Sequence, residues 1–172
     1  MIANAIIGQP LQLDTVQLCQ NNVCDTFIFG IDTPTSILER FGTIRSSDEI
    51  KKYAGKHAHG SFYKHTDIKY DSLGIIFEFK SNRYKAKNQA DTANTYLYKI
   101  YVIPPSTTCL SYDICIGKTE VEIDSIMSTK GIPILTEPTK KIVLYSLLGI
   151  ELRFTLVEDL FILTQIATLE YK

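Results

Sequence analysis

The clearest pattern in the chain is a strand signature that occurs twice. Residues 70–79 read YDSLGIIFEF and residues 145–154 read YSLLGIELRF, and the two segments align without gaps. After each glycine, apolar residues recur at every second position; the residues between them are Ile76 and Glu78 in the first copy and Glu151 and Arg153 in the second. A period of two predicts strands with one buried face and one solvated face. Gly74 and Gly149 each follow a short apolar stretch, so we expect both to take the left-handed conformation that closes a hairpin.

Further elements flank each signature in the same order. A third strand is predicted over residues 96–102 in the first copy and over residues 161–169 in the second, because both segments are rich in aromatic and β-branched residues. Upstream of each signature, helices are predicted over residues 34–41 and 120–127. Their expected boundary residues are Thr33 or Asp32 as cap, Pro34 as first helical residue, Gly42 as terminator, and Thr119 with Glu122 as a capping box.

These elements predict an α+β fold class, as an internal duplication of a helix plus antiparallel-sheet unit. Repeat 1 covers residues 15–103 and repeat 2 covers residues 104–172. One unit alone has an apolar sheet face that a single short helix cannot cover, so we expect the two units to share one compact globule. Repeat 1 is longer than repeat 2 because of two insertions, at residues 46–67 and 80–93.

The two insertions are the candidate binding surface. The spacing of Ser46 and Glu49 is that of a capping box, which predicts one or two helical turns ending at Gly55. Both insertions mix aromatic residues with Lys, Arg and His, and exposed aromatic side chains among cations are typical of protein interfaces. The alternative is that the aromatic residues of the first insertion pack underneath it. The residues expected to bind a partner are Tyr53, His57, His59, Phe62, Tyr63, Arg83, Tyr84 and Lys85.

Four cysteines form two close pairs, Cys19 with Cys24 and Cys109 with Cys115. Local pairing is the simplest arrangement, because each disulfide would close a short turn. Free buried thiols and a metal site are the alternatives, although zinc knuckles use two to four residues between cysteines and the second pair has five. Two disulfides predict a periplasmic or extracellular location. Residues 3–5 (Ala-Asn-Ala) have the small-x-small shape of a signal-peptidase site, through either a signal-peptide remnant or chance.

Composition narrows the possible functions. Apolar residues make up 45% of the chain and the formal net charge is −1, which indicates a folded protein and argues against nucleic acid as a partner. No apolar run is long enough for a transmembrane helix. The chain contains no Gly-x-Ser-x-Gly, phosphate-loop or His-Glu-x-x-His motif, so we expect no enzymatic activity, no catalytic residues and no cofactor.

The three histidines lie close together, at positions 57, 59 and 65. His-x-His on a strand places both rings on one face, so a metal or small-molecule site at these residues is one interpretation. The other is a polar loop that happens to be rich in histidine. We predict no metal site, because no Asp, Glu or Cys stands between His57 and His65.

The segments FGIDTPTSILERFG (residues 29–42) and IGKTEVEI (residues 116–123) resemble the helix-opening pattern of two related groups. One group is the small outer-membrane assembly lipoproteins of the BamE/SmpA type, and the other is the tandem-repeat β-lactamase inhibitor proteins. The closing strands from Gly74 and Gly149 are also similar, and the tandem layout over about residues 15–171 favours the inhibitor-like arrangement. The resemblance implies a domain that binds other proteins and performs no chemistry.

The expected function is therefore that of a non-enzymatic secreted or periplasmic protein-binding protein. It would act as an inhibitor or immunity protein that blocks an enzyme or toxin. The alternatives are an envelope-assembly or structural scaffold factor, and a metal or small-molecule binder that uses His57, His59 and His65.

Overall fold

The computed structural model describes most of the chain. The described residues are 15–21, 23–42, 49–56, 62–81, 95–110, 113–127 and 130–169, with the backbone alone at residues 53–56, 62 and 147.

The expected α+β class is wrong, because the described structure is mostly β. It contains two antiparallel sheets, of four and eight strands, and two short helices. In chain order the elements are β1 (Thr15–Gln20), β2 (Val23–Ile28), α1 (Pro34–Phe41), β3 (Glu49–Lys56), β4 (Phe62–Tyr70), β5 (Ile75–Lys80), β6 (Tyr96–Val102), β7 (Cys109–Leu110), β8 (Ile114–Cys115), α2 (Glu120–Ile126), β9 (Ile132–Thr136), β10 (Lys140–Tyr145), the 3₁₀ helix η2 (Ser146–Leu148), β11 (Ile150–Val157) and β12 (Leu160–Thr168).

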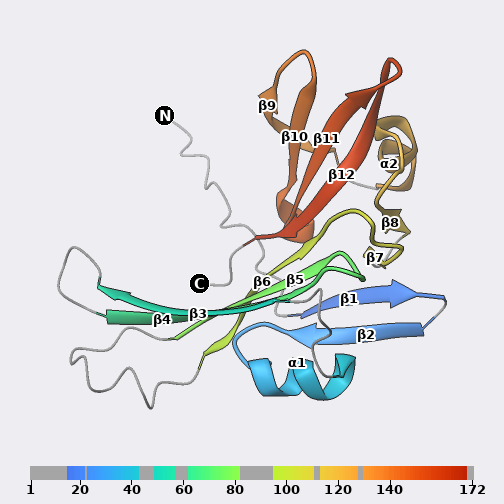
Figure 1. Cartoon of the computed structure of the whole chain (residues 1–172). Helices are drawn as coiled ribbons and strands as arrows, with labels where there is room; N and C mark the ends of the chain where they lie inside the picture. The colour runs from blue at the N-terminus through green and yellow to red at the C-terminus, as the bar shows by residue number, and fades with distance from the viewer. Residues whose placement is uncertain are drawn as a thin grey trace, which may run out of the picture.

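The same succession of elements occurs in each half of the chain (Figure 1). A hairpin, a helix and four strands follow one another as β1 to β6, and again as β7 to β12. The small sheet has the order β2–β1–β7–β8, and the large sheet has the order β3–β4–β5–β6–β12–β11–β10–β9. The two halves therefore meet in the middle of both sheets. In the large sheet only two residue pairs join them, Val102 with Ile166 and Tyr101 with Ala167.

The helical turns expected after Ser46 are replaced by a strand. Residues 49–56 form β3, which pairs with β4 over eight residue pairs, from Glu49–Lys69 to Lys56–Phe62. Pairing with the next strand has overridden the local capping-box signal, since β structure depends on cross-strand neighbours more than on local propensity. The insertion at 46–67 is thus most of a long hairpin, and its counterpart in the second half is the shorter β9–β10. The insertion at 80–93 lies outside the described residues except for Lys80 and Ser81.

The helix boundaries agree with the sequence. In α1 the Thr33 hydroxyl accepts a hydrogen bond from the Ser36 N–H, Pro34 is the first helical residue, and Gly42 follows the last turn with φ of 81°. In α2 Thr119 and Glu122 form the predicted capping box. These features depend on residues within one turn of each other, so the local sequence is sufficient to specify them.

Both predicted glycine turns are confirmed. Gly74 and Gly149 have φ of 62° and 61°. The Gly74 carbonyl accepts a hydrogen bond from the Ile103 N–H at 2.8 Å, and the Gly149 carbonyl accepts one from the Leu169 N–H at 2.7 Å. Each turn thereby holds the residue that follows the last strand of its half, β6 or β12.

Aromatic side chains fill the core of the first half. The Phe27 ring on β2 lies 5.9 Å from Phe41 on α1 and 5.2 Å from Phe77 on β5. Phe41 also contacts Phe77 and Tyr70, at 5.3 and 5.4 Å. The helix and the β1–β2 hairpin therefore pack against one face of β4 and β5, which is the face that the period-two pattern predicted to be buried.

All four cysteines lie in one row across the small sheet. Cys19 is the cross-strand partner of both Cys24 and Cys109, and Cys109 is the partner of Cys115. The disulfides are Cys19–Cys24 and Cys109–Cys115, as the sequence predicted. Two disulfides are consistent with an extracellular or periplasmic protein. In the described part of the chain, neither helix has the length and apolar character needed to cross a membrane.

Candidate functional site

The candidate site is the open face of the large sheet, which we define as the face opposite α1 and β2. In β4 and β5 the cross-strand pair Ile68–Phe77 is buried against the core, so the adjacent pair Asp67–Glu78 belongs to the open face. The open face of the first half, formed by β3 to β6, is dominated by charged and aromatic side chains. That of the second half, formed by β9 to β12, carries smaller and more aliphatic ones.

One row of charges crosses all four strands of the first half. Lys51 is the cross-strand partner of Asp67, Asp67 is the partner of Glu78, and Glu78 is the partner of Lys99. Directly opposite residues share a face and lie close together. The two carboxylates are therefore neighbours in the middle of the row, with a lysine at each end.

A β-bulge brings a tyrosine into the same row. Glu78 pairs with Lys99, but Phe79 pairs with Leu97, so Tyr98 is the extra residue of the bulge. Tyr98 and Lys99 consequently both lie on the open face, where strict alternation would have separated them. The Tyr98 hydroxyl donates a hydrogen bond to Glu78 Oε2 at 3.0 Å, and the Tyr101 hydroxyl donates one to the same oxygen at 3.4 Å.

Electrostatics around Glu78 follow from this packing. Burial raises the pKa of Glu78 above its usual value, and the neighbouring negative charge of Asp67 adds to the effect. The hydrogen bonds from the tyrosines and the positive charge of Lys99 oppose it. Burial also raises the pKa of the Tyr101 hydroxyl, and the negative charge of Glu78 adds to that shift. Tyr101 therefore acts as a neutral hydrogen-bond donor at physiological pH.

Aromatic rings continue the surface from Tyr98 to the far end of β4. The His65 ring makes edge-to-face contacts with Tyr63 at 4.9 Å and with Tyr98 at 5.9 Å. Lys80 Nζ lies 4.4 Å from the centre of the Tyr98 ring, and Lys99 Nζ lies 5.0 Å from that of Tyr101. Ring–ring and cation–π contacts of this kind hold side chains in fixed orientations.

In the second half the same backbone carries different side chains. Alignment of the two strand signatures places Arg153 at the position of Glu78. A second bulge, opposite Arg153 and Phe154, makes Thr164 the counterpart of Tyr98 and Gln165 the counterpart of Lys99. The Thr164 hydroxyl lies 3.1 Å from that of Thr155, so two short side chains stand where the first half has Tyr98 and Lys80.

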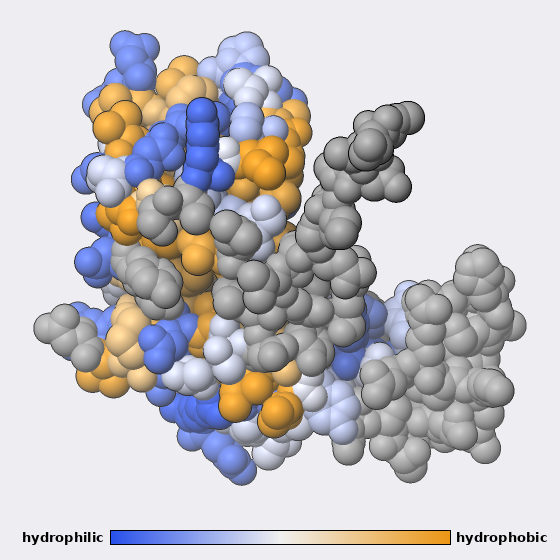
Figure 2. All heavy atoms as spheres, turned by 180° about the vertical axis from the view of Figure 1, so that it is seen from behind, coloured by the Kyte–Doolittle hydropathy of each residue, from blue (hydrophilic) through white to orange (hydrophobic). Residues whose placement is uncertain are grey.

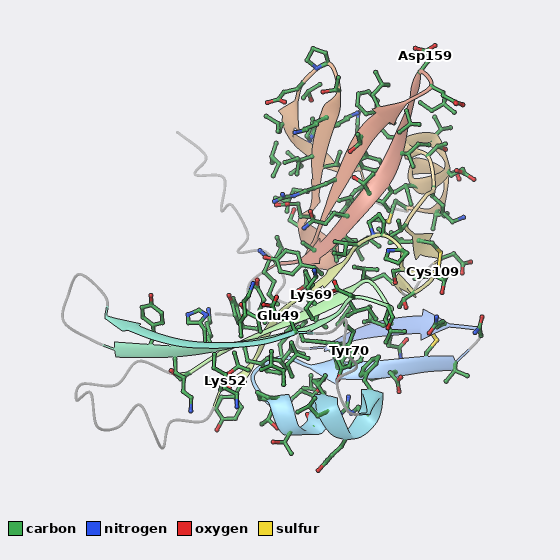
Figure 3. All side chains as sticks on the ribbon, viewed as in Figure 1. Glu49, Lys52, Lys69, Tyr70, Cys109 and Asp159 are labelled. Atoms are coloured by element: carbon green, nitrogen blue, oxygen red, sulfur yellow. A yellow bond between two sulfur atoms is a disulfide. The ribbon has the colours of Figure 1, made fainter. Side chains whose placement is uncertain are left out.

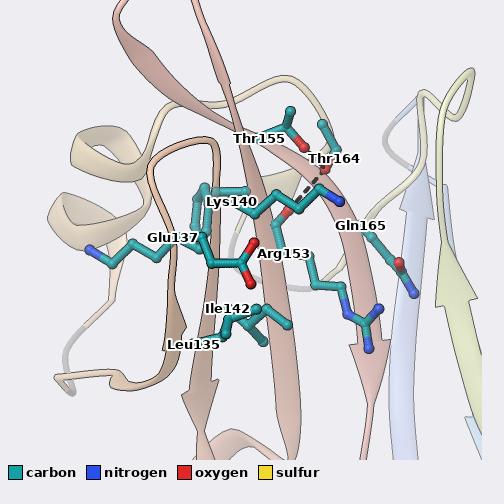
Figure 4. Close-up of a pocket in the computed structure, with 10 residues that line it drawn as sticks. Leu135, Glu137, Lys140, Ile142, Arg153, Thr155, Thr164 and Gln165 are labelled. Carbon is teal, nitrogen blue, oxygen red and sulfur yellow. Dashed lines mark hydrogen bonds between the residues drawn. The ribbon is translucent and has the colours of Figure 1, made fainter.

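The short side chains leave a hollow of about 400 Å³ on the open face of the second half (Figure 4). Two aliphatic residues of neighbouring strands and several charged and polar groups surround it. Its lining residues are Leu135, Glu137, Lys140, Lys141, Ile142, Arg153, Phe154, Thr155, Thr164 and Gln165.

The arrangement is suited to binding. Lysines stand at both ends of the carboxylate row, and two tyrosines donate to Glu78. Among the described residues, no group of three His, Cys, Asp or Glu side chains could hold a metal ion. Most side chains of this face in the first half are half-buried by their neighbours. Figure 3 draws the described side chains on the ribbon. Little conformational freedom would be lost when a partner covers them.

Of the residues expected to bind a partner, Tyr63 is the one whose side chain the structure describes, and it lies on the open face beside His65. Tyr53 belongs to β3 and Phe62 to β4, where the backbone alone is described. The remaining five lie outside the described residues: His57, His59, Arg83, Tyr84 and Lys85.

Sequence reasoning missed Tyr98, Lys99 and Tyr101 as members of this surface. The signal was present in β6, where tyrosines occupy the positions between buried aliphatic residues. The bulge at Tyr98 hid this signal, because strict alternation of side chains along a strand assigns Tyr98 and Lys99 to opposite faces of the sheet.

Comparison with known protein families, curated proteins and solved structures finds no match for this chain. The resemblance to the inhibitor and assembly-lipoprotein groups therefore stays a prediction. The fold and the site define a mostly-β protein with two disulfides and an open sheet face that is aromatic and charged in one half.

Proposed function

We propose that this is a non-enzymatic, secreted or periplasmic protein that binds another protein through the open face of its first half. The observation that carries the proposal is the fixed cluster around Glu78, in which Tyr98 and Tyr101 donate to one carboxylate oxygen while Lys80 and Lys99 stack on the two rings. Tyrosine is enriched at the energetic centres of protein interfaces because it adds contact area at a low cost in conformational entropy.

The difference between the halves supports this location. Both halves bury corresponding core positions, such as Phe77 in β5 and Leu152 in β11. Packing requirements therefore explain the inward residues of each half but not the tyrosines on the open face of β6, whose counterparts in β12 are Thr164 and Ala167. A surface that departs from its structural counterpart in this way is the first place to seek function.

The finer roles of inhibitor or immunity protein rest on the same surface. Lys51, Lys80 and Lys99 supply positive charge around a negative centre, a pattern that can select one partner by charge complementarity. An envelope-assembly scaffold would use the same face for a membrane-associated complex, and the nature of the captured partner separates the two roles.

The test is affinity capture with matched variants. The immobilised protein is incubated with secreted and envelope fractions of the organism that encodes it, and bound proteins are quantified by mass spectrometry. The Tyr63→Ala/Tyr98→Ala variant should lose the specific partner by about tenfold or more. The control is Thr155→Ala/Thr164→Ala on the open face of the second half, which should retain the partner. Equal capture by both variants would refute the proposed surface.

A further inference from the structure

The four cysteines follow one another across the small sheet in the order Cys24, Cys19, Cys109 and Cys115, on β2, β1, β7 and β8. We call this set the cysteine row. Each native disulfide joins the two cysteines of one hairpin, and none of the four is free. The two middle members, Cys19 and Cys109, lie directly opposite each other but belong to different disulfides. They are the one pair of neighbours in the row without a bond between them.

The cysteine row lies on the outward face of the small sheet. Leu18 and Ile114, which alternate with the cysteines along β1 and β8, are buried against the core, so the cysteine side chains point the other way. Cys24 is exposed and the other three cysteines are half-exposed. The next row on this face, Gln17 with Thr26, is polar and exposed. Apolar side chains are exposed on the second half (Figure 2), but they belong to α2, β9, β11 and β12, outside the small sheet. A thiol in solution can therefore reach the row.

We propose that the cysteine row is a thiol–disulfide exchange site whose reaction partner is a dithiol reductant. Directly opposite residues of an antiparallel pair have Cα atoms about 4.5 or 5.5 Å apart, and disulfides span Cα separations of about 4.4–6.8 Å. Cys19 and Cys109 can therefore be bonded without movement of the backbone. Exchange proceeds by attack of a thiolate on a disulfide sulfur. The order of the row places Cys19 on the side of Cys109 opposite to Cys115, which is the direction that an in-line displacement at sulfur requires.

The reaction has two steps, and the reductant supplies both electrons. A thiolate of the reductant attacks the exposed Cys24 Sγ, the Cys24–Cys19 bond breaks, and Cys19 leaves as a thiolate. The second thiol of the reductant then displaces Cys24, which is protonated, and the reductant is released as a disulfide. In the second step Cys19 Sγ attacks Cys109 Sγ, the Cys109–Cys115 bond breaks, and Cys115 leaves as a thiolate that takes up a proton. One disulfide has been reduced, and the remaining disulfide joins Cys19 to Cys109.

The product differs from the native protein in how its halves are connected. The native disulfides join residues that are 5 and 6 positions apart, whereas Cys19 and Cys109 are 90 positions apart and lie in different halves. The large sheet joins the halves through two residue pairs, so the new disulfide adds a covalent link between them. A disulfide that closes a longer loop restricts the unfolded chain more. Exchange therefore locks the two halves together and leaves one thiol at each end of the row.

The first test places one thiol beside one intact disulfide. In Cys24→Ser the thiol is Cys19, which faces Cys109. In the matched control, Cys19→Ser, the thiol is Cys24, which lies about 10 Å from Cys109 across two strand spacings. Both variants are incubated without reductant at about pH 8.5, the ordinary pKa of a thiol, quenched with a maleimide and mapped by mass spectrometry without reduction. Label on Cys115 should be about tenfold or more higher in Cys24→Ser, because its thiol attacks within the same molecule.

Two results of this first test would overturn the proposal. One is a Cys24→Ser variant with label on Cys19 alone, which would mean that Cys19 does not reach Cys109. The other is equal labelling of Cys115 in both variants, which would mean that exchange occurs between molecules or through unfolded chains. Circular dichroism verifies that both variants are folded.

The second test uses the wild-type protein, treated with one equivalent of dithiothreitol and then with the maleimide. Molecules that have lost one disulfide should include a form labelled on Cys24 and Cys115, with a Cys19–Cys109 disulfide in the peptide map. Labels confined to one hairpin, on Cys19 with Cys24 or on Cys109 with Cys115, would overturn the proposal. Neither test depends on the proposed binding of another protein.

Discussion

Asp67 and Glu78 lie directly opposite each other on β4 and β5, so two carboxylates are cross-strand neighbours on the open face. Lysines stand at both ends of the row that they form, and two tyrosines donate to the carboxylate of Glu78. The arrangement resembles an interface core more than a solvated surface, because Glu78 is partly withdrawn from water and accepts hydrogen bonds from two tyrosines.

This pair gives the first prediction, on pH. Because burial raises the folded-state pKa of Glu78 above its ordinary 4.5, the ionised carboxylate is disfavoured in the folded protein. The stability that the protonated Glu78 carboxyl group contributes is fully present below pH 4.5. It is lost as the pH rises through the folded-state pKa of Glu78. Glu78→Gln has no charge to ionise. The variant should therefore match the wild type below pH 4.5 and exceed its melting temperature at neutral pH.

Thermal unfolding followed by circular dichroism at the two pH values provides the measurement. Glu39→Gln on the exposed side of α1 controls for the loss of one negative charge. A Glu78→Gln variant that is less stable than the wild type at neutral pH would show that the tyrosine hydrogen bonds to the charged carboxylate outweigh its burial.

A second prediction concerns Asp32, which is buried at the start of α1. Its carboxylate accepts hydrogen bonds from the Ile28 N–H at 2.7 Å, the Ser36 hydroxyl at 3.0 Å and Arg40 Nη2 at 2.8 Å. Asp32→Ala leaves these donors without their acceptor and should lower the free energy of unfolding by about 2–3 kcal/mol. Urea denaturation is the measurement, with the exposed Glu39→Ala as control. A loss below that of the control would mean that water replaces the carboxylate.

Gly42 and Gly74 both have positive φ angles, and replacing each by alanine distinguishes the cost of backbone strain from the cost of steric crowding. Gly42 has φ of +81° and nothing within 4 Å of an added Cβ, whereas a Cβ at Gly74, φ +62°, would lie 2.7 Å from Ser106 N and collide with the Ile103 carbonyl oxygen. Gly42 has ψ of −178°, a backbone region that is essentially restricted to glycine, so Gly42→Ala should cost about 1–3 kcal/mol from backbone strain alone. Gly74→Ala should cost more, because the backbone after β6 must also move. Equal costs in urea denaturation would show that the turn relaxes freely.

The cysteine row makes a prediction about alternative pairing. Cys19 and Cys109 are cross-strand partners on β1 and β7, so Cys24→Ser/Cys115→Ser should form a Cys19–Cys109 disulfide when oxidised with glutathione disulfide. In the converse variant, Cys19→Ser/Cys109→Ser, the remaining thiols lie on β2 and β8, about 14 Å apart across three strand spacings. That distance is too long for a disulfide. Peptide mapping without reduction distinguishes the two, and free thiols in the first variant would contradict the register.

Local sequence was sufficient for the features that depend on near neighbours. The caps at Thr33 and Thr119, the left-handed turns at Gly74 and Gly149, and the disulfides within each hairpin all join residues that lie close in the chain. A few adjacent side chains determine the stability of these caps, turns and disulfides, so the pattern of residue types along the chain predicts where they form. The buried faces of β5 and β11 were also predictable, because period two links residue order directly to burial.

The tertiary structure alone decided the features that depend on partners distant in the chain. The spacing of Ser46 and Glu49 is a helix-start signal, but pairing with β4 makes residues 49–56 a strand, which adds to the mostly β character of the described structure. Tyr98 joins Glu78 because a bulge in β6 shifts its side chain onto the open face, and no local signal in residues 96–102 marks that bulge. Cys19 meets Cys109 because the two hairpins share one sheet. Strand pairing joins segments through backbone hydrogen bonds that any residue except proline can donate, so the residue sequence specifies the strands more strongly than it specifies their neighbours.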